Sequence, residues 1–232
     1  MTDHIVEHFF DSREVASSAA AQHIVALLRK RLAVQAATSL VVTGGSSPAD
    51  CYAELAATAI DWSRVHVVLS DERWVPPQHT DSNERLLRET LLRKRAAAAE
   101  LLPVFNATDT PGERCAALNR IMPGLPLPFS CTLLGMGDDG HFASLFPDAA
   151  NLAAGLDPNN SEWCIPVTTA ASEHLRISMT LSALLRSEQI LLLFFGATKR
   201  DVYEQAKAAV PIYPVTSLLS RAQVPVHLFW AA

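Results

Sequence analysis

Six short apolar runs limit what this chain can fold into more than any other feature of the sequence. Most are continuous rather than alternating, which is typical of strands covered on both faces. The runs are SLVVTGG (39–45), VHVVLSD (65–71), CTLLGMG (131–137), LRISMT (175–180), QILLLFFG (189–196) and VPVHLFW (224–230). Helical patterns at 13–33, 81–95 and 197–209 lie between them. This alternation predicts an α/β fold: a doubly wound, mainly parallel sheet flanked by helices, Rossmann-like in its order.

The chain is long enough for one large α/β domain and does not require two. It has 232 residues, of which 49% are hydrophobic and 19% charged, so it can bury a substantial core. The proline-rich stretch PGLPLPFS (123–130) reads as a connector, and no shift in composition divides the chain. We therefore expect a single domain spanning 1–232.

Charge and cysteine usage exclude several classes of protein. The net charge is −5 with no basic stripe, which argues against nucleic-acid binding. No stretch approaches the roughly 20 apolar residues of a membrane span, and the first residues lack the basic end and apolar core of a secretory signal. Cysteines occur singly, with no C-x-x-C pair, which favours small core residues over disulfides or a metal site. We expect a soluble, cytoplasmic protein without a metal.

Four polar clusters follow the predicted strands. They are GGSSP (44–48), SDERWVPP (70–77), GMGDDGH (135–141) and GATKR (196–200). Ligands of doubly wound sheets bind beyond the carboxyl ends of the strands, where these clusters fall. The sequence therefore predicts that the four clusters converge on one rim and form a ligand site.

The first cluster suits an anionic group. Gly44 and Gly45 would let backbone approach a ligand, and Ser46 and Ser47 offer hydroxyl groups beside the N–H groups of a helix start. The alternative is an ordinary turn in which Ser47 caps the helix and Pro48 is its first residue. The two interpretations are compatible.

Three cations lie at the starts or ends of other predicted elements. Arg73, after Asp71 at a strand end, could clamp a phosphate with its forked donors, although a surface ion pair is the more common fate of such a group. Lys199 at the head of a helix is a second candidate, against a solvated helix lysine. Arg176 at the start of a strand is a third.

His141 is the candidate general base. It follows a glycine-rich loop at a predicted strand-to-helix junction, and Asp139 is close enough in sequence to orient its imidazole or favour its charged form. Other histidines, such as His66 and His227 inside strands, are assigned to structure.

Gly135, Gly137 and Gly140 have the G-x-G-x-x-G spacing of a dinucleotide-binding loop. Two acids, Asp138 and Asp139, lie inside the loop, where a pyrophosphate would be repelled. The loop also follows at least two strands, whereas the fingerprint usually opens its domain. We interpret the glycines as tight turns and expect no nucleotide cofactor.

The loop LGMGDDGHFASLFP resembles the signature loop of the 6-phosphogluconolactonases. The similarity extends, in the family's order, to VVTGGSSP, SDERWVPPQHTDSN and RISMTLSALLRSEQILLLFFGATKR, and thus covers most of the chain. In the related glucosamine-6-phosphate deaminases the loop continues toward an N-E-P segment. Here it continues Ser144-Leu145-Phe146-Pro147, without that glutamate, which favours the lactonase branch. Phe142 stands where the family usually has threonine.

The resemblance implies hydrolysis of 6-phospho-D-glucono-1,5-lactone to 6-phosphogluconate in the oxidative branch of the pentose phosphate pathway. A δ-lactone is an activated ester, and the chain has neither a G-x-S-x-G elbow nor an H-E-x-x-H pattern, so no cofactor, metal or covalent nucleophile is expected. The implied partner is a sugar-phosphate lactone, and the protein a monomer or small homo-oligomer. The catalytic residues that the resemblance implies are His141 and Asp139. The residues expected to bind the substrate and its phosphate are Gly44, Gly45, Ser46, Ser47, Arg73, Lys199 and Arg176. Asp71 is expected to have a supporting role only.

Two alternatives remain open from the sequence. A sugar-phosphate isomerase or deaminase would retain an additional acid after the histidine loop. A non-catalytic effector-binding domain of a sugar-sensing regulator would carry a helix-turn-helix and would not need His141.

Overall fold

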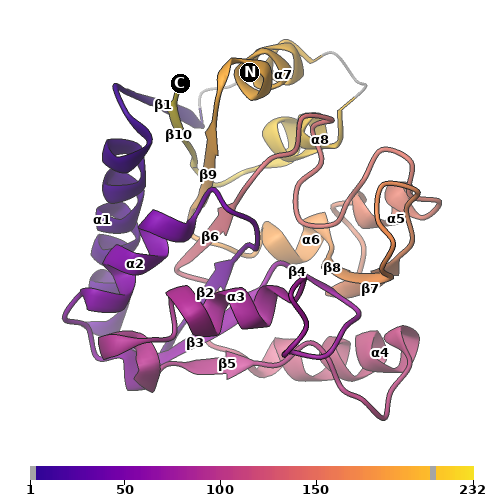
Figure 1. Ribbon diagram of the computed structural model, residues 1–232, viewed down its shortest axis with the longest axis horizontal. Helices are drawn as coiled ribbons and strands as arrows, with labels where there is room; N and C mark the ends of the chain where they lie inside the picture. Colours follow the sequence, from indigo (N-terminus) through magenta and orange to yellow (C-terminus); the bar gives the residue numbers. More distant parts are fainter. Residues whose placement is uncertain (1–3, 210–212) are drawn as a thin grey trace.

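A seven-stranded sheet and a smaller three-stranded sheet form the framework of the computed structural model, which describes residues 4–209 and 213–232 (Figure 1). The large sheet is parallel throughout, in the order β1-β10-β9-β6-β2-β3-β5. The small sheet is antiparallel, in the order β4-β8-β7. Figure 1 shows α1 and α2 on one side of the large sheet and α6 and α8 on the other. The predicted α/β class and mainly parallel sheet are confirmed.

The elements have the following bounds. The strands are β1 (Ile5–Phe10), β2 (Thr38–Val42), β3 (Val65–Leu69), β4 (Asp71–Arg73), β5 (Glu100–Leu102), β6 (Cys131–Leu134), β7 (Cys164–Val167), β8 (Arg176–Met179), β9 (Ile190–Phe195) and β10 (Val226–Ala231). The α-helices are α1 (Arg13–Leu32), α2 (Ala49–Ala57), α3 (Asn83–Thr90), α4 (Pro111–Ile121), α5 (Leu152–Gly155), α6 (Leu181–Leu184), α7 (Ala197–Lys207) and α8 (Pro214–Arg221). Three 3₁₀ helices are η1 (Trp62–Arg64), η2 (Lys94–Ala98) and η3 (Met122–Gly124).

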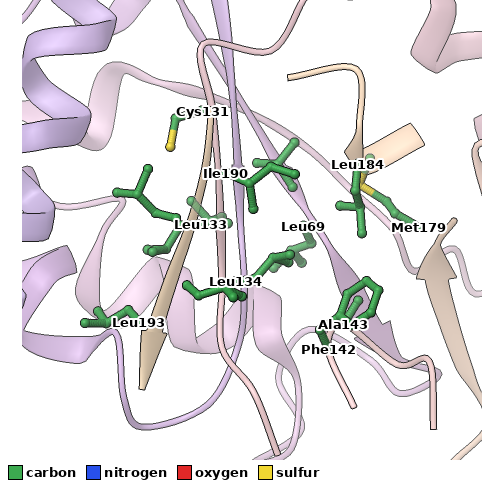
Figure 2. Packing of buried hydrophobic residues seen from close by; sticks show 14 of the residues in the cluster. Leu69, Cys131, Leu133, Leu134, Phe142, Ala143, Met179, Leu184, Ile190 and Leu193 are labelled. Carbon is green, nitrogen blue, oxygen red and sulfur yellow. The ribbon is translucent and has the colours of Figure 1, made fainter. Parts of the chain in front are cut away.

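The central strands are buried on both faces, as the continuous apolar runs predicted. All five residues of β2 are buried, and β9 is buried at every position except Phe195. Figure 2 shows Leu133 and Leu134 of β6 packed near Ile190 of β9 in the same apolar cluster. Burying such side chains is the dominant stabilising term in folding. The central strands therefore hold the loops at their carboxyl ends in fixed positions.

Helix α1 covers the sheet because its ends and its inner face suit that position. The Ser12 hydroxyl accepts a hydrogen bond from the backbone N–H of Val15 (3.3 Å), and three basic residues in the last turn favour the negative end of the helix dipole. The small buried residues Ala16 and Ala20 allow the helix to approach the strands closely.

The order of the strands places a topological switch point between β2 and β6. From β2 the chain proceeds to β3 and β5 on one side, and from β6 it proceeds to β9 and β10 on the other. In open α/β sheets the crevice at such a point, beyond the carboxyl ends of the strands, is where ligands bind. The loops after β2 and β6 carry the sequences GGSSP and GMGDDGH.

Several elements differ from the prediction. The run at 175–180 forms β8 in the small antiparallel sheet rather than a strand of the main sheet. The helical pattern at 81–95 divides into α3 and the 3₁₀ helix η2. Strand β1 was not predicted because none of its residues is buried and its sequence, IVEHFF, is partly polar, as expected for an edge strand. No helix within 4–209 or 213–232 has the length and apolar character that crossing a membrane requires.

Candidate active site

The four polar clusters converge on one pocket of about 230 Å³ beyond the ends of β9, β6, β2 and β3, four adjacent strands. This convergence was predicted and is confirmed. The pocket is lined by Thr43, Gly44, Gly45, Ser46, Ser47, Pro48, Asp71, Arg73, Asn83, Gly135, Met136, Gly137, His141, Phe142, Ala143, Arg176 and Lys199. Every candidate residue named from the sequence therefore lines this pocket except Asp139, which contacts His141 but does not line the pocket.

His141 and Asp139 form a hydrogen-bonded pair. The Nδ1 atom of His141 lies 2.5 Å from Oδ1 of Asp139, which also accepts the backbone N–H of His141 (3.1 Å). A carboxylate only accepts hydrogen bonds, so Nδ1 carries the proton and Nε2 is left with the lone pair. The centroid of the ring lies 4.1 Å from that of Phe146, with the two planes tilted by 31°, and 28% of the side chain is exposed. The imidazole is thus oriented on two sides and open to the pocket.

Gly137 makes room for this pair. A Cβ atom there would overlap the imidazole of His141 and would lie 2.6 Å from Oδ1 of Asp139. The loop is closed by hydrogen bonds from the N–H of Gly137 to the carbonyl of His141 (2.9 Å) and from the N–H of Gly140 to the carbonyl of Gly137 (3.0 Å). Gly140, at φ +73°, also packs against Tyr213, where a Cβ atom would come within 2.7 Å. The glycine spacing serves a tight turn that holds His141.

The predicted strand-to-helix junction at His141 is wrong. Residues 135–151 contain no helix, and the next one, α5, begins at Leu152. A dinucleotide-binding loop needs a helix start directly after the glycines to receive the pyrophosphate. Its absence supports the interpretation that the glycine spacing is not a nucleotide fingerprint.

The GGSSP loop, between β2 and α2, lines the same pocket. Gly45 has φ +86°, a conformation that favours glycine, and a Cβ atom at Gly44 would overlap the side-chain amide of Asn83. Ser47 does not cap α2: Pro48 occupies the cap position, and the helix begins at Ala49. The backbone N–H groups of residues 45–47 have no acceptor within the described ranges, which leaves three consecutive donors for an anionic ligand.

Two arginines face each other across the strand pair β4–β8. Arg73 and Arg176 are directly opposed in the antiparallel register. Like charges in such a pair destabilise the folded state unless something neutralises them. Asp71 partly does so, with Oδ2 at 3.7 Å from Nη1 of Arg176. Burial lowers the pKa of the Arg176 guanidinium; Asp71 works against that shift and Arg73 adds to it. Glu72 and Asp81 also oppose that shift, so two guanidinium groups and three carboxylates lie close together here.

Donors of the cationic side chains remain available. Arg73 donates through Nη1 to the carbonyl of Asp81 (2.6 Å), while its buried Nε has no partner among residues 4–209 and 213–232. The side-chain ammonium of Lys199, in the first turn of α7, has neither an ion pair nor a hydrogen bond within the same described ranges. Unpaired donors around one pocket are suited to phosphate oxygens.

Three residues that hydrogen-bond to the pocket lining or to its neighbours were not identified from the sequence. Ser144 donates to Oδ2 of Asp71 (2.6 Å) and accepts from Nη1 of Arg176 (3.2 Å). Asn83 is 3% exposed and donates to the backbone carbonyl of Asp71 (2.9 Å). Glu72 accepts hydrogen bonds from the start of α3, including the N–H of Asn83 (2.7 Å); burial raises its pKa, and these bonds oppose that shift. All three make their contacts with residues more than ten positions away in the sequence. The only sequence signal near them is the helix start near residue 82.

Phe142 lies in the core. Its side chain is 1% exposed and belongs to the apolar cluster that Figure 2 shows beside Ala143. The residue also forms a β-bridge with Leu145. The ring therefore fills space under the histidine loop, where a threonine hydroxyl would need a polar partner.

Comparisons with known proteins find one family. A family model described as glucosamine-6-phosphate isomerases/6-phosphogluconolactonase matches residues 11–230. A 6-phosphogluconolactonase of Rhizobium meliloti (strain 1021) is 34% identical over 226 residues, which cover 97% of each chain. One of Pseudomonas aeruginosa is 36% identical over 211 residues, covering 90% of this chain and 88% of the relative. A crystal structure of a 6-phosphogluconolactonase from Shewanella baltica OS155 superposes with a TM-score of 0.94 at 35% identity, covering 100% of both chains.

Proposed function

This chain belongs to the family of glucosamine-6-phosphate isomerases and 6-phosphogluconolactonases, and from that premise we propose that it hydrolyses 6-phospho-D-glucono-1,5-lactone to 6-phosphogluconate. It is a lactone hydrolase, as its relatives at about 35% identity are named. The observation that carries the mechanism is the His141–Asp139 pair, 2.5 Å apart, in one pocket with three cationic side chains.

We assign His141 the role of general base. Asp139 holds the proton on Nδ1, so Nε2 is the atom that takes a proton from water. The resulting hydroxide attacks C1, the carbonyl carbon of the lactone. The π electrons of the C=O bond then move onto the carbonyl oxygen. When this tetrahedral intermediate collapses, the bond from C1 to the ring oxygen breaks. The imidazolium returns its proton to that oxygen, and the ring opens to the acid.

The opposed arginines and Lys199 are proposed to bind the phosphate. Arg73 and Arg176 line the pocket from β4 and β8, and Lys199 and the GGSSP loop line it from the segments after β9 and β2. Asp71 and Ser144 hold Arg176 in position rather than contact the substrate. The free N–H groups of residues 45–47 are candidate donors to the phosphate or to the developing oxyanion.

The test is a hydrolysis assay on freshly made 6-phosphogluconolactone, corrected for spontaneous hydrolysis. The wild-type chain is expected to accelerate the reaction. His141→Ala should lower kcat by about 10²–10⁴-fold with little change in KM, because the base acts mainly in the transition state. A folded His141→Ala protein with near-native turnover would remove this residue from the mechanism.

Two further arms separate the alternatives. Turnover of glucosamine 6-phosphate in place of the lactone would support a deaminase. Binding of the sugar phosphate without any turnover would support an effector domain. One lactonase domain over 1–232, a monomer or small homo-oligomer, a cytoplasmic location and no binding of nucleic acid remain predictions of the sequence.

A further inference from the structure

Two histidines and an aspartate meet outside the active-site pocket. His79 and Asp81 lie in the loop between β4 and α3, and His174 lies in the loop between β7 and β8. Nε2 of His174 is 3.0 Å from Oδ2 of Asp81, and Nδ1 of His79 is 3.8 Å from the same oxygen. Within the ranges 4–209 and 213–232, this is the one group of three such side chains with all ligand atoms within 4.8 Å of one another.

The proposed mechanism does not use this cluster. Asp81 and His174 line a second pocket of about 250 Å³, which also contains Ser172 and Glu173. Arg73 and Arg176 line both pockets, so the two pockets adjoin at these residues. None of the three cluster residues lines the active-site pocket, so the cluster is adjacent to the proposed phosphate site and distinct from it.

We propose that His79, Asp81 and His174 bind one transition-metal ion of the Zn²⁺ class. Two imidazole nitrogens and one carboxylate oxygen are a ligand set that Zn²⁺ prefers, with water in the fourth position. Mg²⁺ and Ca²⁺ require more oxygen ligands than this cluster offers. A tetrahedral ion with bonds of about 2.0–2.1 Å sets its ligands about 3.3 Å apart. The two separations from the Asp81 oxygen, 3.0 and 3.8 Å, lie on either side of that value, and the two histidine nitrogens lie within 4.8 Å of each other.

The surroundings suit entry of an ion from solvent. The exposed fractions of the His79, Asp81 and His174 side chains are 41%, 52% and 27%, and the two rings meet edge to face at 5.3 Å. Nδ1 of His79 accepts the backbone N–H of Asp81 (3.1 Å), so this nitrogen carries the lone pair that a metal needs. The ion would displace that bond and the hydrogen bond from Nε2 of His174 to Asp81 (3.0 Å), and the proton on that nitrogen would move to Nδ1 of the same ring by exchange with water.

Binding would cross-link two loops that are far apart in sequence. The loop with His79 and Asp81 follows Arg73, whose Nη1 donates to the Asp81 carbonyl, and the loop with His174 leads into Arg176. The ion would therefore stabilise both arginine-bearing strands without touching the substrate. This inference does not depend on the proposed lactonase function.

The experiment is calorimetric titration of the metal-free full chain with ZnCl₂, and with MgCl₂ as the comparison ion. We expect one Zn²⁺ per chain with micromolar affinity, a higher Tm in Zn²⁺, and no binding of Mg²⁺. Loss of one ligand should weaken Zn²⁺ binding by about tenfold or more in His79→Ala and in His174→Ala. His66→Ala is the matched control, because His66 pairs with Glu100 elsewhere on the sheet (3.1 Å), and should bind as the wild type does.

Two loops supply the ligands, so two independent variants test the site, and their Tm values without metal show whether they fold. Unchanged Zn²⁺ affinity in either folded ligand variant would overturn the proposal. So would absence of Zn²⁺ binding below about 100 μM, or binding that disappears in His141→Ala, which would assign the ion to the active site instead.

Discussion

Replacing Gly137 by alanine tests whether the glycine spacing exists to hold the His141–Asp139 pair. The new Cβ atom would overlap Cε1 and Nδ1 of the imidazole and would lie 2.6 Å from the carboxylate oxygen, whereas ordinary contacts of a Cβ atom begin near 3.4 Å. The ring must therefore move by about 1 Å or more. A displacement of that size at a reacting group lowers the rate by about 10²-fold. We expect kcat to fall by that factor, with KM nearly unchanged.

The fold should tolerate this change. Gly137 does not have a positive φ, so alanine adds no backbone strain, and the imidazole is partly exposed and can swing toward solvent. The free energy of unfolding should change by less than about 1.5 kcal/mol, which is within the ordinary range for a single substitution. Thermal melts check this separately from activity.

Gly135→Ala is the matched control in the same loop. Its Cβ atom would meet only the carbonyl oxygen of Leu193, at 4.0 Å, which is ordinary van der Waals contact. Its kcat should stay within about threefold of wild type, since nothing at His141 must move. Initial rates on fresh lactone measure both variants. If Gly137→Ala keeps native turnover, or if Gly135→Ala loses as much, the steric reasoning is refuted.

Three further predictions follow from the described contacts. Arg73→Ala and Lys199→Ala should each lower kcat/KM for the phosphorylated lactone by about ten- to a hundredfold, because a charge-assisted contact is worth roughly 1.5–3 kcal/mol; equal losses on unphosphorylated gluconolactone would contradict their role as phosphate ligands. Burial, with His23 and His8 nearby, lowers the pKa of His227 from 6.5 to about 4. The unfolded chain therefore binds the proton first, and stability should fall as the pH drops from about 6.5 toward 4, by about 1–2 kcal/mol after allowance for solvent screening. Melts of His227→Gln should show a shallower acid loss, and an unchanged slope would count against the assignment. Finally, calorimetry should detect no NAD or NADP binding to the loop at 135–140; micromolar binding abolished by a Gly137 substitution would reverse that interpretation.

Local patterns in the sequence determined the class of fold and the rim that bears the site. Continuous apolar runs identify strands buried on both faces, because only such strands can be apolar at every position. Parallel strands end at the same edge, so polar clusters after those runs had to meet there. The sequence alone therefore predicts that His141, Arg73 and Lys199 lie at one pocket, and the resemblance adds their expected roles.

Tertiary structure alone decided how these residues face one another. The opposition of Arg73 and Arg176 depends on a second, antiparallel sheet, which the apolar run at 175–180 does not distinguish from the parallel one. Contacts such as Ser144 to Asp71 join segments 73 residues apart, and the fit of Gly44 against Asn83 depends on how two loops pack. Hydrophobic periodicity reports only the local environment of a segment. Register and partner choice come from packing between distant segments, which is why they had to be read from the fold.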